Sequence, residues 1–289
     1  MTDFAQLAIP FSGALSARAT FTGRRACRLG RHLARSLSLE LCSDDAPSAR
    51  IDVAVVSGQG VQGTGHNILS DKVAPLNAIG KNGEYCLSIP EEACSPAMLR
   101  ATLKIIWLLT LRSLQDAGLE AMPLHGNLLC FPDSERGIVC FGPSGMGKTT
   151  AGRRWTRQGG DCQADDMLLV VKEDDRYLAR AMPTWSRFPD AVETSRSFML
   201  DGVFLLQRGE GDVIVKSREP AVWRYELVQE MMFHFGGGDF FCAEEQAKML
   251  DKSLELAEGL SRHFGAYEIL GALDGTLLEN VRGFLCRRG

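Results

Sequence analysis

Short apolar runs and helix-like apolar stripes succeed one another along the chain. The runs are bounded by turn-forming residues and predict strands at 124–131, 138–141, 167–171, 200–208, 213–215 and 267–270. The stripes predict helices at 95–117 and 243–264, and helix-compatible residues bounded by start and stop signals predict others at 149–157, 220–235 and 274–285. Strands interspersed with helices in this way are typical of an α/β fold, here with a mixed β-sheet.

The pattern is weaker before the helix that is predicted to begin at residue 95. It gives one clear strand there, at 51–56. We therefore divide the chain into an N-terminal α/β portion of uncertain boundary, residues 1–94, and a second domain, residues 95–289.

Within the second domain the pattern also predicts which parts pack together. The strands 124–131 and 138–141 flank a short turn and are expected to pair as a hairpin. In the helix 243–264, the expected buried side carries Ala247, Leu250, Leu254 and Leu260.

A glycine-rich segment, GPSGMGKTT at residues 142–150, follows the second strand of this hairpin. It satisfies the phosphate-loop pattern G-x-x-x-x-G-K-[ST]. Glycines permit positive φ and turn several N–H groups toward one anion, and the helix that follows adds its positive dipole end. Lys148 is expected to reach the outer phosphates, and the Thr149 hydroxyl to bind Mg²⁺. The sequence thus predicts an ATP and Mg²⁺ site whose nucleotide-binding residues are Gly142, Ser144, Gly145, Met146, Gly147, Lys148, Thr149 and Thr150.

Asp165 and Asp166 stand directly before the apolar run 167–171. Mg²⁺ on a triphosphate needs hard oxygen ligands, and an acceptor hydroxyl needs a base in line with the γ-phosphate. Two adjacent carboxylates at the start of a strand can divide these tasks. A charged turn remains the alternative interpretation of the pair. The hairpin is expected to place His125 near the nucleotide. The alternative interpretation is that His125 is an ordinary half-buried histidine without a role in the site.

Composition limits the classes of partner. The chain of 289 residues is 45% hydrophobic and 24% charged, as in globular proteins, and its net charge of −4 argues against a nucleic-acid partner. Its longest membrane-like run, 105–111, is too short to span a bilayer, so we expect no membrane partner. Nine cysteines, an odd number without metal-ligand spacing, indicate free thiols and a cytoplasmic location.

Three segments carry a resemblance to a known family. LHGN at 124–127, GPSGMGKTT at 142–150 and QGGDCQADD at 158–166 resemble the catalytic core of bacterial HPr kinase/phosphorylase. The fold of that family is related to ATP-type phosphoenolpyruvate carboxykinase, and its members share the separation of Lys148 from Asp165. The resemblance covers about residues 120–172. It implies a P-loop core with Asp165 as general base, Asp166 as a residue that supports Mg²⁺ or orients its neighbour, and His125 in the site.

One departure from the family affects the substrate. The family's Arg-Gly-Leu-Gly stretch, which supplies a metal-binding Glu, is not found after the acid pair. In its place, residues 182–187 resemble the smaller HPr-kinase-like proteins found beside peptide-modification enzymes. The resemblance therefore implies a kinase that phosphorylates a hydroxyl, serine above all, on a peptide or small protein, with an acceptor pocket that we expect to include 182–187 and 236–238.

Two other functions stay open at this point. One is a non-catalytic, nucleotide-binding regulatory subunit, which the missing stretch favours. The other is a small-molecule kinase, such as a free amino-acid kinase, which would differ only in its acceptor pocket. The sequence also leaves open whether the chain forms a homo-oligomer.

Overall fold

The computed structural model describes most of the second half of the chain and parts of the first. The described residues are 4–12, 15–22, 26–28, 30–31, 34, 49–56, 77–81, 84–90, 105, 108–109, 111–112, 115, 118–182, 196–233, 241–271 and 276–288. The chain divides into two compact units, Met1–Leu119 with Phe235–Lys248, and Glu120–His234 with Met249–Gly289. The predicted boundary after residue 94 lies outside the described residues.

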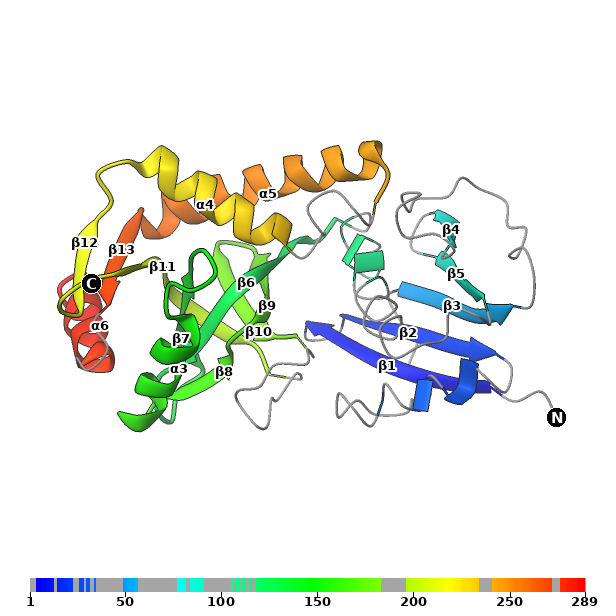
Figure 1. Ribbon diagram of the computed structural model, residues 1–289, viewed down its shortest axis with the longest axis horizontal. Helices are drawn as coiled ribbons and strands as arrows, with labels where there is room; N and C mark the ends of the chain where they lie inside the picture. The colour runs from blue at the N-terminus through cyan, green and yellow to red at the C-terminus, as the bar shows by residue number, and fades with distance from the viewer. Residues whose placement is uncertain are drawn as a thin grey trace. The chain divides into compact units, whose positions relative to one another are not determined.

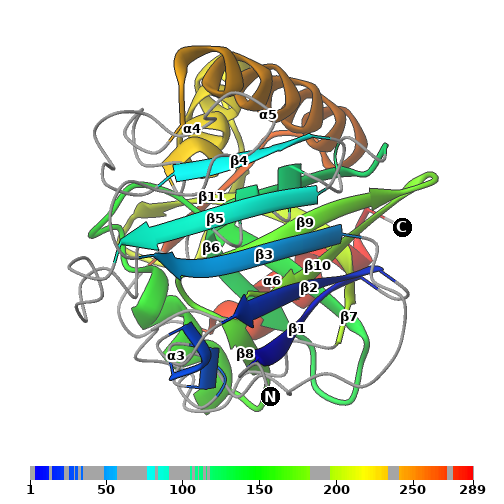
Figure 2. The same ribbon diagram turned by 90° about the vertical axis from the view of Figure 1, so that its right-hand side faces the viewer.

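The first unit contains a five-stranded sheet, which Figure 2 shows face on. Its order is β1-β2-β3-β5-β4, with parallel pairing of β2 to β3 and of β3 to β5. The strand predicted at 51–56 is confirmed as β3. Of the helix predicted at 95–117, the described residues 105, 108–109, 111–112 and 115 are helical. The strands are β1 (Phe4–Ser12), β2 (Leu15–Thr22), β3 (Ala49–Val56), β4 (Asn77–Lys81) and β5 (Glu84–Pro90).

The second unit is built on an eight-stranded mixed sheet. Its order is β10-β9-β6-β7-β11-β13-β12, and β8 pairs with β6 beside this path. The pairs β7/β11 and β11/β13 are parallel, whereas β6 is antiparallel to β7, β8 and β9. The strands are β6 (Glu120–Cys130), β7 (Arg136–Phe141), β8 (Asp161–Ala164), β9 (Met167–Glu173), β10 (Arg176–Ala181), β11 (Phe198–Arg208), β12 (Val213–Lys216) and β13 (Tyr267–Gly271).

Helices cover both faces of this sheet (Figure 1). α3 (Lys148–Arg157) and α6 (Leu277–Cys286) lie on one face, and α4 (Pro220–Met232) and α5 (Ala243–Phe264) lie on the other. The mixed α/β class predicted from the sequence is confirmed. The predicted hairpin is also confirmed, because β6 and β7 pair antiparallel in the register Gly126↔Phe141.

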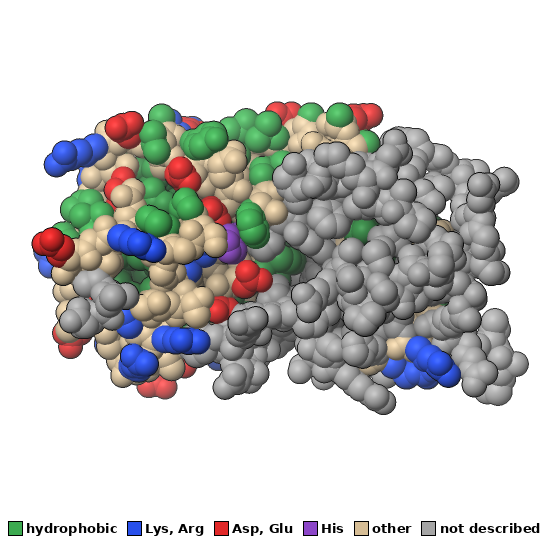
Figure 3. Space-filling view, in the orientation of Figure 1, with side chains coloured by type: hydrophobic (Ala, Val, Ile, Leu, Met, Phe, Trp, Pro, Cys, Tyr) green, Lys and Arg blue, Asp and Glu red, His purple; other side chains and the backbone are tan. Residues whose placement is uncertain are grey.

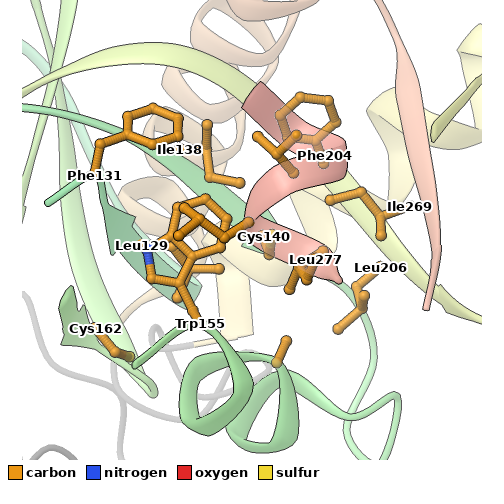
Figure 4. Packing of buried hydrophobic residues seen from close by; sticks show 13 residues of the cluster. Leu129, Phe131, Ile138, Cys140, Trp155, Cys162, Phe204, Leu206, Ile269 and Leu277 are labelled. Carbon is orange, nitrogen blue, oxygen red and sulfur yellow. The ribbon is translucent and has the colours of Figure 1, made fainter. Parts of the chain in front are cut away.

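Trp155 lies in the hydrophobic core that fills the space between the sheet and the helices α3 and α6 (Figure 4). Its ring is fully buried, lies 5.4 Å from the ring of Phe131, and donates a 2.7 Å hydrogen bond from Nε1 to the carbonyl of Cys130. A Cβ on Gly160 would overlap this indole. The Gly159-Gly160 pair therefore has two uses: Gly159 ends α3 at φ +90°, and Gly160 lets β8 pass the tryptophan.

The expected buried side of α5 is wrong for three of its four residues. Leu260 is fully buried, but Ala247 is exposed and Leu250 and Leu254 are 41% and 52% exposed. Figure 3 shows hydrophobic side chains at the surface where Figure 1 draws α4 and α5. The helix has apolar residues on two neighbouring stripes, and periodicity alone did not distinguish them. The buried stripe is Met249, Ser253, Leu256, Ala257, Leu260 and Phe264.

In the part of the chain that the structure describes, no helix combines the length and the apolar character needed to cross a membrane.

Candidate functional site

The glycine-rich segment 142–147 connects the end of β7 to the start of α3. Gly142, Gly145 and Gly147 have φ values of +147°, +85° and +100°, which favour glycine at each position. Gly142 also has a steric reason, because a Cβ there would lie 2.9 Å from the carbonyl oxygen of Leu206 on β11. The glycines that the sequence motif requires thus hold a tight turn against the neighbouring parallel strand.

Lys148 is the first residue of α3, and only 7% of it is exposed. Its Nζ donates to the carbonyl oxygens of Gly142 at 2.5 Å and Pro143 at 3.4 Å, so the ammonium lies over the loop. Burial lowers the pKa of Lys148, and the negative charges of Glu230 and Asp166 oppose that shift. An anion on the loop would add a negative charge close to this partly desolvated ammonium and so favour its charged form.

The start of α3 is fixed to strand β6. Asn127, on β6, donates from Nδ2 to the carbonyl of Lys148 at 2.9 Å. Gly147 occupies the N-cap position and has no side chain to accept from the first-turn N–H groups. The positive end of the helix therefore faces the loop without a side-chain cap.

Asp165 and Asp166 lie where β6 changes its pairing partner. β8 pairs with β6 at Leu128–Cys130 and β9 pairs with β6 at Glu120–His125, and the two aspartates connect β8 to β9. Asp165 is 8% exposed, and its Oδ2 accepts from the Thr149 hydroxyl at 3.4 Å. The side chain of Asp166 is 47% exposed. The neighbouring carboxylates thus have different surroundings.

His125, also on β6, lies between Asp166 and a buried glutamate of α4. Its Nδ1 is 2.5 Å from Oε2 of Glu230, and its Nε2 is 3.8 Å from Oδ1 of Asp166. The ring of Phe233 stacks on the imidazole with centroids 4.4 Å apart. A proton on Nδ1 that is donated to Glu230 fixes the tautomer and directs Nε2 toward Asp166.

These side chains surround one cavity of about 650 Å³. Every residue predicted for the site lines it except Gly142, which is buried behind the loop, and Met146, which lines a neighbouring cavity. The lining residues are His125, Ser144, Gly145, Gly147, Lys148, Thr149, Thr150, Arg153, Asp165 and Asp166. The segments expected in the acceptor pocket lie outside the described residues, apart from Met182.

Three residues at the site were not predicted from the sequence. Arg153 is exposed one turn into α3 and lines the cavity, and the motif pattern ends before it. Glu230 and Phe233 come from the end of α4, far along the chain from His125. The sequence gives no clear signal for Glu230, because the apolar residues of α4 do not form one stripe that would mark its buried side.

The oxygen donors of the site fit a hydrated Mg²⁺ on a triphosphate. Among the described residues, no group of three or more His, Cys, Asp or Glu side chains could hold a metal ion. Mg²⁺ in phosphoryl-transfer sites takes only one or two protein carboxylates or hydroxyls and fills its other positions with phosphate oxygens and water. Thr149 with Asp165 meets this requirement, and so does the more exposed Asp166.

The chain matches a known family of proteins. The family model described as SynChlorMet cassette protein ScmC matches residues 95–285, which is more than half of the chain. No curated protein matches the chain.

Proposed function

The chain belongs to the ScmC family of SynChlorMet cassette proteins, and we propose that it is an ATP- and Mg²⁺-dependent kinase related to the HPr kinases. In this proposal the segment 142–150 is a P-loop and the acceptor is a hydroxyl, above all serine, of a peptide or small protein. The acceptor class rests on the sequence resemblance described above.

One observation carries the proposal. A single cavity of about 650 Å³ contains a loop with an anion-binding pattern, a lysine, a hydroxyl–carboxylate pair and a histidine–carboxylate pair. Groups of these kinds serve phosphoryl transfer when they lie together, because catalysis depends on positioning and on charge stabilisation at the γ-phosphate. Each element also has a local cause in the fold, from the positive-φ glycines to the change of partner along β6.

The two ends of the cavity have separate roles in this proposal. The first-turn N–H groups of α3 and the Lys148 ammonium bind the phosphates, and Thr149 with Asp165 would hold Mg²⁺, which supplies positive charge to the phosphate oxygens. Asp166 and His125 face the acceptor. The geometry therefore favours Asp166 over Asp165 as the base, which exchanges the roles implied by the resemblance.

The proposed reaction is a single transfer of the γ-phosphoryl group from ATP to the acceptor hydroxyl. Asp166 takes the proton of the acceptor hydroxyl as the hydroxyl oxygen forms its bond to the γ-phosphorus. The bond from that phosphorus to the β–γ bridging oxygen breaks, and ADP leaves. His125 lies beside Asp166, with Nε2 3.8 Å from Oδ1 of the carboxylate, and Glu230 and Phe233 hold its ring in place.

Label transfer from γ-labelled ATP tests the proposal. Candidate peptides encoded near the protein, free serine and water are offered as acceptors to the wild type and to Lys148→Ala. We expect label on a peptide with the wild type and at least a hundredfold less with the variant, because it lacks the phosphate contact. Label on free serine alone would identify a small-molecule kinase. ATP binding with no transfer to any acceptor would identify a regulatory subunit.

A further inference from the structure

A second cavity, of about 530 Å³, lies on the other side of the glycine-rich loop. It shares Gly145, Gly147 and Thr150 with the first cavity, so the two are separated only by the loop and the first turn of α3. The remaining lining comes from the loop, α3 and the ends of two strands: Met146, Ala151, Arg154, Arg208, Gly209 and Gly271.

The position of this cavity follows from the parallel part of the sheet. β7, β11 and β13 are adjacent and parallel, so their carboxyl ends lie at one edge. The loop follows β7, Gly209 follows β11, and Gly271 ends β13; the N–H of Gly209 donates to the carbonyl of Gly271 at 3.0 Å. Ligands of open α/β sheets bind beyond the carboxyl ends of parallel strands.

Charged side chains fix the walls of the cavity. Arg208, which is exposed, donates from Nη2 to the carbonyl of Gly145 at 3.0 Å and so connects the end of β11 to the loop. Arg154 is buried and forms an ion pair with Asp212, whose backbone carbonyl accepts from Asn280 of α6. The cavity is therefore bounded by fixed groups around the Arg208 guanidinium, a group that stacks on planar rings.

We propose that this cavity holds the nucleoside, sugar and base, of the nucleoside triphosphate whose phosphates lie on the loop. The inference rests on the proposed kinase function and gives the nucleotide a direction across the sheet. The γ-phosphate points to Asp165, Asp166 and His125 on the β6 side, and the nucleoside points to the ends of β11 and β13. A volume of about 530 Å³ is within the range of small-molecule sites.

Calorimetry with two probes separates the nucleoside from the phosphates. MgATP and magnesium tripolyphosphate are titrated into the wild type, Met146→Trp and the size-matched control Met146→Leu. Met146 lines the second cavity and not the first, so a tryptophan there occupies the space assigned to the nucleoside. We expect Met146→Trp to weaken MgATP binding at least about tenfold and tripolyphosphate binding less than about twofold, with Met146→Leu like the wild type.

The outcomes distinguish this inference from the proposed function. A wild type that binds neither probe would overturn both. A wild type that binds MgATP no more tightly than tripolyphosphate, or a Met146→Trp variant that weakens both probes equally or neither, would overturn only the nucleoside site.

Photolabelling gives the location without a substitution. After irradiation with 8-azido-ATP, peptide mapping of the wild type should find the label in residues 145–154, 208–217 or both. Label confined to 120–130 or 161–173, on the β6 side, would show that the base lies at the opposite end and would overturn the proposal.

Discussion

Nδ1 of His125 lies 2.5 Å from Oε2 of Glu230, although the two residues are 105 positions apart in the chain. Both are buried, at 8% and 6% exposure. The contact joins β6 to α4, which packs on this strand. A buried carboxylate is costly without a hydrogen-bond partner, so the contact satisfies Glu230 and holds the imidazole of His125 in one orientation.

The pair also determines which ring nitrogen of His125 faces the cavity. With Nδ1 held by Glu230 and the ring covered by Phe233, Nε2 is left facing Asp166 at 3.8 Å. Glu230 does not line the cavity and acts through His125. It is therefore a positioning residue in the proposed reaction.

Replacement of the glutamate tests this role. Glu230→Gln keeps the shape of the side chain but loses the charge, so we expect kcat for phosphoryl transfer to fall by about 10²-fold while KM for ATP stays within about threefold. Glu226→Gln, one turn earlier on α4, is the matched control and should have wild-type kcat. A rise in KM without a fall in kcat would contradict the positioning role.

The two aspartates are separated by a second experiment. If Asp165 supports Mg²⁺ with Thr149, Asp165→Asn should raise the Mg²⁺ concentration needed for half-maximal activity by about tenfold or more. If Asp166 is the base, Asp166→Asn should lower kcat by about 10²–10⁴-fold with MgATP affinity within about threefold. The measurements are Mg²⁺ titrations of activity and calorimetry of MgATP binding. The opposite pattern would restore the roles that the sequence resemblance implies.

Local pattern was enough to predict much of the second unit. The β6–β7 hairpin, α3 and α5 have strong periodicity and clear glycine or proline boundaries, and α5 has the predicted bounds of residues 243 and 264. The glycine-rich segment carries its own conformational requirement, which the three positive φ values satisfy. These features depend on residues close together in the chain.

What could not be predicted depends on contacts between distant segments. β8 has only four residues, of which Asp161 and Gln163 are polar, and β10 has six. Their pairing with β6 and β9 therefore has no local signal in the sequence. Glu230 reaches His125 only because α4 packs on β6. The burial of Leu260 rather than Leu254 depends on which stripe of the part of α5 in the second unit, residues 249–264, packs against the rest of that unit.

The buried thiol of Cys162 should contribute to the pH dependence of stability, together with Cys130 and Cys140, whose pKa values burial also raises. Burial, followed by the negative charge of Asp165, raises the pKa of Cys162 from 9.0 to about 12. The folded protein therefore holds this proton more tightly than the unfolded chain. The resulting stabilisation is fully present below about pH 9 and is lost as the pH rises toward 12, at up to about 1.4 kcal/mol per pH unit.

Urea unfolding at pH 8.5 and 10.5 measures this effect. The free energy of unfolding should fall less between the two pH values in Cys162→Ala than in the wild type. Cys286→Ala removes an exposed thiol and should leave the wild-type pH dependence unchanged. An equal fall in wild type and Cys162→Ala would show that the thiol is ionised in the folded protein at lower pH than its burial implies.

The two apolar stripes of α5 can be compared by replacing a leucine with alanine on each of them. Leu260 is fully buried, so Leu260→Ala should lower the free energy of unfolding by about 2–5 kcal/mol through lost burial and a cavity. Leu254 is 52% exposed, so Leu254→Ala should change it by less than about 0.5–1 kcal/mol. Urea denaturation of both variants at one protein concentration makes the comparison. A loss at Leu254 as large as that at Leu260 would mean that the exposed stripe is covered in solution, and repeating the measurement over a range of protein concentrations would then show whether a second copy of the chain covers it.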